Sequence, residues 1–373
     1  MSNLDAYLMK IREKNIICWG LGRHFYSTTY HFLEMANLIP RVRCLVDSNV
    51  KGVDKRYAEK LSGCPIIVPD DIKDWVDDNT IILISVADYG AIVDVINANP
   101  DIQNVDWLPD RFLAMLQTDD EILNVPKTPN APKPYHKNSE IRIPKIINTF
   151  WFSNDPIPEK YQKCVDSWKK YCPDYEIRIW SLNDYNPHGN RYFEEAISVK
   201  KWAFASDFSR IDIICQNGGV YMDLDVEVVK PLDDLLHNDA YLGFEDFIQI
   251  DCGSGFGATK GNKIFEEIRD EYKDRVFILP DGSFDQTTCP KIYTPVLERH
   301  GLKRNGSFQE VEDITVYPFE YLSAKSFLTG IIYQTENTYT IHHHEGSWLT
   351  EESKRINSSR YNAVDEFRKL FQL

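Results

Sequence analysis

The sequence predicts two α/β domains: a smaller Rossmann-like parallel domain over residues 1–124, and a second α/β domain over residues 142–350. In both regions apolar segments of strand length alternate with helical patterns, which is typical of sheets covered by helices. A proline-rich linker, residues 125–141, separates them. At 373 residues the chain is also longer than one hydrophobic core usually supports.

Five strands are expected in the N-terminal domain, with helical connections that make neighbouring strands parallel. The expected strands are Asn15–Trp19, Val42–Val46, Pro65–Val68, Ile81–Val86 and Val105–Leu108, and helices between them include Phe25–Ala36 and Asp88–Ala98.

The first turn of this domain partly matches a dinucleotide-binding fingerprint. Gly20-Leu21-Gly22 follows the first strand, and Asp47 ends the second. Phe25 replaces the third glycine of GxGxxG, where bulk hinders close packing of helix on strand. Two interpretations stay open. The domain binds a nucleotide such as NAD, or it serves assembly or holds an acceptor.

Charge argues against nucleic acid as a partner, because phosphate contacts need basic surface. The chain has 42 Lys and Arg against 57 Asp and Glu, a net charge of −15. Residues 1–15 lack the apolar core of a secretory signal, and no run approaches the roughly 18 apolar residues of a spanning helix. Eight cysteines without a CxxC pair lie mostly in apolar runs, as buried free thiols do. We therefore expect a cytoplasmic protein.

Residues 351–373 are expected to form a C-terminal amphipathic helix. Val364, Phe367, Leu370 and Phe371 recur at helical spacing. Packing on the chain's own domain explains this stripe. Peripheral contact with the inner face of a membrane, or with a second copy in a homo-oligomer, are the alternatives.

The second domain opens with a strand–helix–strand series and then reaches its most informative segment. The series is Ile143–Trp151, Tyr161–Lys170 and Tyr175–Trp180. From Ala203 a helix places Asp207 and Arg210 three apart on one face. Asn217-Gly218-Gly219 ends it, since glycine tolerates the left-handed cap conformation, and Val220 begins a strand that reaches Val229.

Asp223 and Asp225 lie two residues apart in this expected strand, so both carboxylates face the same way. Two such carboxylates repel unless a cation lies between them. A hard divalent ion, Mn²⁺ or Mg²⁺, suits one or two carboxylates together with phosphate oxygens of a substrate. An isolated Asp-x-Asp is more often a pair of solvated loop acids, and its setting after Gly-Gly favours the metal.

At this point the sequence resembles glycosyltransferase family 32, which includes capsule-forming bacterial transferases and the yeast initiating mannosyltransferase. The large clostridial glucosylating toxins have a similar block. The resemblance covers residues 143–350 and implies a GT-A type nucleotide-sugar transferase domain. It is carried by Ser206-Asp207-x-x-Arg210 … Asn217-Gly218-Gly219-x-Tyr221-x-Asp223-x-Asp225, with Ile143–Trp151, Tyr175–Trp180 and His342–Trp348.

The resemblance also implies roles for individual residues. Phe150 and Trp151 bind the donor, with Trp151 stacked on the base, and Tyr221 lines the donor site. Asp207 and Arg210 hold the sugar, while Ser347 and Trp348 cover the diphosphate. Each has a structural alternative: a core tryptophan at a strand end, or a helix-surface salt bridge.

For the metal, the resemblance implies that Asp225 is a direct ligand and that Asp223 contacts ribose or metal-bound water. A third ligand comes from a histidine three residues before a glycine, here His343 before Gly346, with His344 as the other candidate. Asp246 is the candidate base, and Asp251 is placed near sugar or acceptor.

Two positions depart from the family pattern, and each leaves one assignment open. His344 stands where an aromatic is usual, which leaves the ligand assignment open. Cys289 stands where glycine is frequent, which leaves the acceptor geometry open.

The expected function is therefore a retaining, metal-dependent hexosyltransferase. It takes its sugar from a nucleotide-diphosphate donor, with a UDP-sugar as the default. The acceptor is a hydroxyl of a glycan or lipid-linked glycan, in capsule or cell-surface polysaccharide synthesis. The alternative is an NAD-dependent sugar reductase or epimerase that uses the N-terminal domain.

Overall fold

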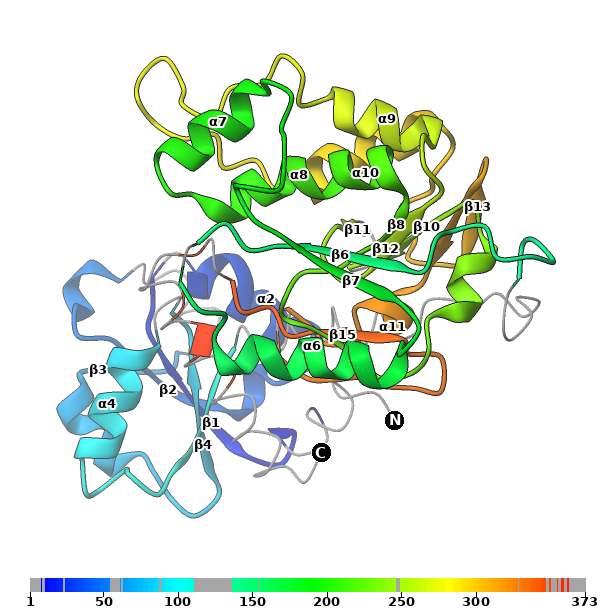
Figure 1. The fold of residues 1–373 in the computed structure, drawn as a ribbon. Helices are drawn as coiled ribbons and strands as arrows, with labels where there is room; N and C mark the ends of the chain where they lie inside the picture. The colour runs from blue at the N-terminus through cyan, green and yellow to red at the C-terminus, as the bar shows by residue number, and fades with distance from the viewer. Residues whose placement is uncertain are drawn as a thin grey trace. The chain divides into compact units, whose positions relative to one another are not determined.

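Figure 1 shows the fold in a computed structural model of the chain. The structure describes residues 8, 11–22, 24–53, 61, 63–86, 89–110, 136–153, 155–245, 249–327, 329–346, 349, 354, 357–358 and 361. The chain divides into two compact units, Met1–Asp120 with Glu351–Leu373, and Glu121–Thr350. Most of the predicted linker and nearly all of the predicted C-terminal helix lie outside the described residues.

The first unit contains the Rossmann-like parallel sheet that the sequence predicts. Its strand order is β3-β2-β1-β4-β5, and every pairing is parallel. The strands are β1 (Asn15–Trp19), β2 (Val42–Val46), β3 (Ile66–Ile67), β4 (Thr80–Ile84) and β5 (Asp106–Pro109).

The described helical segments of this unit are short. The expected helix Phe25–Ala36 is a π-helical turn, Phe25–Thr29, followed by α2 (Tyr30–Met35). Among the described residues this unit also contains the 3₁₀ turns Ile39–Arg41, Val50–Gly52 and Pro69–Asp74, and α4 (Gly90–Ala98).

The second unit is built on an eight-stranded mixed sheet of order β13-β14-β10-β12-β8-β6-β7, in which β11 also pairs with β10. The strands are β6 (Ile146–Phe150), β7 (Glu176–Trp180), β8 (Gly219–Tyr221), β10 (Ala240–Phe244), β11 (Ile250–Asp251), β12 (Phe256–Ala258), β13 (Gln309–Val311) and β14 (Ile314–Tyr317). A separate two-stranded sheet pairs β9 (Val226–Val228) with β15 (Thr340–His342).

Each face of the large sheet buries its own core. Helices α7 (Arg191–Ser198), α8 (Trp202–Asn217), α9 (Lys263–Asp270) and α10 (Pro290–Arg299) pack on one face. On the other lie α6 (Glu159–Tyr171), the β9–β15 sheet, a 3₁₀ turn (Asp233–His237) and α11 (Phe319–Leu322). Figure 1 shows α8 and α10 on one side of β6 and α6 on the other. Among the described residues, no helix is both long and apolar enough to cross a membrane.

The predicted strand from Val220 to Val229 is wrong as one element, because the chain leaves the large sheet after Tyr221 and enters the small one at Val226. The indole N–H of Trp168, on α6, donates to the carbonyl of Val226 at 2.7 Å and helps fix the second strand. Asp223 and Asp225 therefore lie in the connection between two sheets.

Gly219 lets β8, the last strand before this crossing, lie close against β6. Its φ is +99°, and a Cβ there would lie 2.7 Å from the carbonyl oxygen of Ile146 on the neighbouring strand β6. No other amino acid at this position could adopt the positive φ and approach the neighbouring strand so closely at low cost.

We predict that Gly219→Ala lowers the free energy of unfolding by about 3 kcal/mol or more, because backbone strain adds to a clash with fixed backbone. Gly261→Ala is the matched control, since Gly261 also has a positive φ, +71°, but nothing lies within 4 Å of its Cβ position. That variant loses about 1–2 kcal/mol, for the left-handed backbone alone. Urea unfolding midpoints measure both losses, and equal losses would show that the contact with β6 has no effect.

Candidate active site

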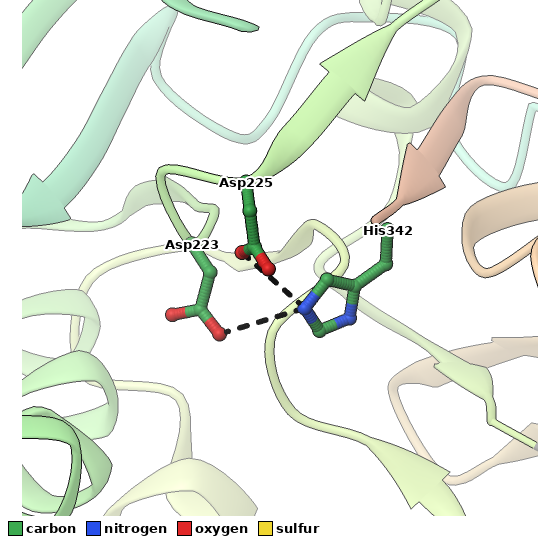
Figure 2. A group of neighbouring side chains, drawn as sticks. All are labelled: Asp223, Asp225 and His342. Atoms are coloured by element: carbon green, nitrogen blue, oxygen red, sulfur yellow. Dashed lines mark ion pairs between the residues drawn. The ribbon is translucent and has the colours of Figure 1, made fainter. Parts of the chain in front are cut away.

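Asp223, Asp225 and His342 come together where the two sheets meet (Figure 2). In the β9–β15 pairing His342 lies opposite Val226, one residue from Asp225. Its Nε2 is 3.4 Å from Asp225 Oδ1 and 3.9 Å from Asp223 Oδ2. One ligand atom from each of the three residues lies within 4.8 Å of the others. Two carboxylates and one imidazole around a common point can hold a divalent cation.

Gly253 leaves the space that the Asp223 carboxylate needs. The Asp223 N–H donates to the Gly253 carbonyl at 2.9 Å, which holds the two segments together. A Cβ on Gly253 would lie 2.4 Å from Asp223 Oδ2 and 2.9 Å from the His342 ring. Any side chain at position 253 would therefore displace this carboxylate or the imidazole.

Arg210 links this centre to Asp207, its neighbour on α8. Its Nη2 lies 3.0 Å from Asp207 Oδ1 and 3.3 Å from Asp223 Oδ1, and its Nη1 donates to the Cys252 carbonyl at 2.9 Å. The guanidinium also lies 5.1 Å from the centre of the Tyr221 ring, whose hydroxyl donates to Asp223 Oδ1 at 2.5 Å. Arg210 is only 5% exposed, so this is a buried, shared ion pair and not a helix-surface salt bridge.

Asp207 and Asp223, which share Arg210, both have raised pKa values. Burial raises the pKa of Asp207 to about 6, although Arg210 opposes it. Burial likewise raises the pKa of Asp223, with Arg210 opposing and the Asp225 carboxylate adding to the rise. These shifts persist beside Arg210 because one guanidinium serves two buried carboxylates.

Asp225 and His342 shift in the directions expected of an ion pair. Burial opposes ionisation of Asp225, but His342 outweighs it and holds the pKa of Asp225 well below its usual range. Burial alone would lower the pKa of His342, yet the carboxylates of Asp225 and Asp251 raise it well above its usual range. A bound divalent cation would take the place of the proton on Nε2.

The cluster of possible ligands contains His342, whereas the sequence predicts His343 or His344 as the third metal ligand. The His343 Nε2 lies 3.1 Å from Glu227 Oε2, on the opposite side of the strand. The His344 Nε2 donates to the Lys325 carbonyl at 2.9 Å, and burial together with neighbouring His342 lowers the pKa of His344 to about 3. Side chains alternate along β15, and pairing with β9 turns His342 toward the aspartates.

Trp151 follows β6 directly, at the strand end where the sequence places it, and is partly buried. Its indole N–H donates to the Asp155 carbonyl at 2.7 Å, and its ring lies edge-on to Tyr161 at 5.9 Å. Lys160, which precedes Tyr161 on α6 and whose Nζ lies over the Tyr161 ring, pairs with Glu345. The backbone N–H of Glu345 donates to Asp225 Oδ2 at 2.8 Å. A chain of contacts therefore connects Trp151 to the acidic centre.

Phe150, predicted to bind the donor, lies in the hydrophobic core of the second unit. It is 7% exposed, and its ring contacts Phe152, Tyr185 and Tyr221. The alternation of side chains along β6 turns it to the face opposite Ile147, beneath α8. Asp246, Ser347 and Trp348 lie outside the described residues, so their predicted roles stay predictions.

Asp251 and Cys289 also take positions that the sequence does not reveal. Asp251 is buried, and its carboxylate accepts hydrogen bonds from the backbone of its own turn. The Cys289 sulfur lies 3.6 Å from Arg210 Nη1, beneath the shared ion pair. Asp251 belongs to no motif that the sequence singles out, and His342 is the one member of the histidine run that the sequence does not propose as a ligand.

Comparison with known proteins points in the same direction. Residues 158–242 match the family model described as "Glycosyltransferase sugar-binding region containing DXD motif". The chain therefore carries a region similar to the sugar-binding region of DXD glycosyltransferases. Asp207, Arg210, Tyr221, Asp223 and Asp225 all lie within it, whereas His342 lies beyond it.

Individual relatives match over limited lengths. Inositol phosphoceramide mannosyltransferase 3 of Schizosaccharomyces pombe is 32% identical over 115 residues, 29% of this chain and 31% of that protein. Subversion of eukaryotic traffic protein A of Legionella pneumophila is 21% identical over 272 residues, 60% of this chain and 41% of that protein. The solved PaToxG glycosyltransferase overlaps with a TM-score of 0.31 at 18% identity, over 42% of this chain and 68% of its own. The chain thus spans less than half the length of these two curated relatives.

We predict that Asp207→Asn stabilises the protein at neutral pH. Because folding raises the pKa of Asp207 to about 6 from an unfolded value near 3.9, the folded state holds this proton more tightly. The stability from this group is fully present below pH ~4 and is lost as pH rises through ~6. Asparagine mimics the protonated form, so the variant should match wild type near pH 4 and exceed it by about 1–3 kcal/mol at pH 7.5. Urea unfolding at both pH values measures this; a variant less stable at pH 7.5 would show that the ion pair with Arg210 outweighs burial.

Proposed function

We propose that the protein is a metal-dependent glycosyltransferase of the GT-A type that uses a nucleotide-diphosphate sugar. One observation carries this proposal. The Asp223–Asp225–His342 cluster lies next to the buried Arg210–Asp207 pair, in and beside a region similar to the sugar-binding region of DXD glycosyltransferases. A cation site adjoining a fixed, buried arginine suits a ligand that carries both phosphate and sugar hydroxyls.

The chemistry requires stabilisation of negative charge that builds on the leaving diphosphate. Mn²⁺ or Mg²⁺ bound at the cluster supplies Lewis-acid stabilisation, and the imidazole of His342 favours Mn²⁺ over Mg²⁺. Arg210 is held by three contacts and needs no reorganisation to act on developing charge. The Asp207 carboxylate, held beside Arg210, can accept hydrogen bonds from donor hydroxyls.

The finer features of the reaction belong to the same proposal. The donor is a hexose linked to UDP, and transfer proceeds with retention of anomeric configuration. The acceptor is a hydroxyl of a glycan or lipid-linked glycan. The relative named an inositol phosphoceramide mannosyltransferase supports a lipid-linked acceptor, and makes a GDP-linked sugar the first rival donor. We place the reaction in the cytoplasm, at the inner face of the membrane, in synthesis of a capsule or cell-surface polysaccharide.

The reductase or epimerase alternative gains no support from the first unit. Asp47, which would bind a ribose hydroxyl, accepts hydrogen bonds from the backbone N–H groups of Leu21 and Asn49 at 2.8 Å each. The Leu21 N–H, which would bind phosphate, is therefore engaged within the domain. Phe25, at the third glycine position, is fully buried.

We predict that Mn²⁺ and one nucleoside diphosphate together raise the melting temperature of the wild-type protein, and that EDTA removes the shift. UDP, GDP, their hexose conjugates and NAD⁺ form the test panel. Asp225→Asn should abolish the Mn²⁺-dependent shift, and His342→Ala, which keeps both aspartates, should weaken it. Both should lower kcat/KM for donor hydrolysis by about 100-fold or more.

Glu227→Gln and His343→Ala are the matched controls, because these neighbours pair with each other and not with the cluster. Both should keep the Mn²⁺-dependent shift. A loss with His343→Ala but not with His342→Ala would return the ligand to the position that the sequence indicated. A shift with NAD⁺ alone, independent of metal, would reject the transferase proposal.

A further inference from the structure

Asp251 is a buried carboxylate whose every oxygen is engaged within the protein. It ends β11, and its side chain is 4% exposed. Oδ1 accepts the backbone N–H groups of Gly253 and Ser254 at 2.6 and 2.7 Å. Oδ2 accepts the hydroxyls of Ser254 and, at 2.8 Å, Ser323, and it lies 3.6 Å from His342 Nδ1. Such a carboxylate is held ionised and immobile behind the histidine.

The hydroxyl of Ser254 sets the position of the proton on His342. A serine hydroxyl has one proton and two lone pairs. Here that proton points to Asp251 Oδ2 or to the Ser323 oxygen, which lies 3.3 Å away. Ser254 Oγ also lies 3.2 Å from His342 Nδ1, and toward this nitrogen it can present only a lone pair. Nδ1 must therefore carry a hydrogen.

We infer that Asp251 is a positioning residue that fixes His342 for cation binding, directly and through Ser254. With the hydrogen held on Nδ1, the lone pair of the neutral ring is on Nε2, the nitrogen that faces Asp223 and Asp225. An outer carboxylate that orients a ligand histidine raises metal affinity in general. The inference rests on the metal site of the proposed function and adds residues, Asp251, Ser254 and Ser323, that hold its nitrogen ligand.

Asp251→Asn reverses this arrangement with little change of shape. The amide oxygen can keep both backbone hydrogen bonds at the Oδ1 position, while the amide nitrogen replaces Oδ2 and donates to the serine hydroxyls. Ser254 then accepts from the amide and turns its proton toward His342 Nδ1. The ring hydrogen moves to Nε2, where it blocks the cation.

The test is a titration of the full chain with Mn²⁺ alone, in which electron paramagnetic resonance measures the free Mn²⁺ and so gives the affinity. We expect Asp251→Asn to weaken binding by about 10- to 100-fold. Ser323→Ala removes a hydrogen bond from the same carboxylate without reversing its polarity, and it should lose much less. Nitrogen-15 spectra of histidine-labelled protein with diamagnetic Mg²⁺ should show the His342 proton on Nδ1 in wild type.

A double-mutant cycle separates this role from a general structural one. If Asp251 acts through His342, adding Asp251→Asn to His342→Ala causes no further loss of affinity. Additive losses would overturn the inference, as would wild-type affinity in Asp251→Asn. Should that variant fail to fold, Ser254→Ala removes the connecting hydroxyl, and unchanged affinity there overturns the relay. No Mn²⁺ binding by wild type would instead reject the metal site itself, and the inference with it.

Discussion

Buried negative charge is the constraint on which this site depends. Four carboxylates, those of Asp207, Asp223, Asp225 and Asp251, lie largely out of solvent around two cationic side chains. Removing so many like charges from water is costly unless each is neutralised, hydrogen-bonded or protonated. The four carboxylates are stabilised in three different ways. Asp251 is satisfied by its own turn, Asp225 by His342, and Asp223 and Asp207 share Arg210.

The sharing of Arg210 leaves the centre short of positive charge. One guanidinium serves two buried acids, so burial still raises the pKa values of Asp207 and Asp223. The negative charge of Asp225 is balanced by His342, and a free histidine side chain is mostly neutral at pH 7. A divalent cation bound at the cluster would replace the proton of His342 and add one further positive charge. A bound cation would therefore supply positive charge that the buried carboxylates lack, and in this sense the residues fit a metal.

Local sequence patterns predict the regular parts of this structure well. Apolar runs give β1 and β2 with their observed bounds, and Gly218 marks the end of α8. Asp223 and Asp225 do face one place, but not because they lie on a strand; the chain turns between two sheets there. That turn is held by backbone hydrogen bonds from Met222 to Asn148 and from Asp223 to Gly253, contacts with distant segments that no local pattern contains.

The same limit applies to the histidines and to Asp251. Which of three consecutive histidines meets the aspartates is decided by the register of β15 on β9, a pairing between segments more than 100 residues apart in the chain. Spacing to Gly346 favoured His343, and tertiary pairing selects His342. Asp251 belongs to a turn that looks like many surface turns in sequence, and only its approach to His342, distant in the chain, shows its use. The position of Phe150 in the core has a related cause, because successive side chains of a strand point to opposite faces of the sheet.

The most direct measurement is a crystal structure of the protein grown with Mn²⁺ and a nucleoside diphosphate, with data collected at an energy where manganese scatters anomalously. We predict a single strong anomalous peak bounded by Asp223, Asp225 and His342, with Nε2 of His342 toward the ion and the diphosphate on its open side. A peak at His343 and Glu227, or a diphosphate bound with these three side chains unchanged and no ion between them, would contradict it.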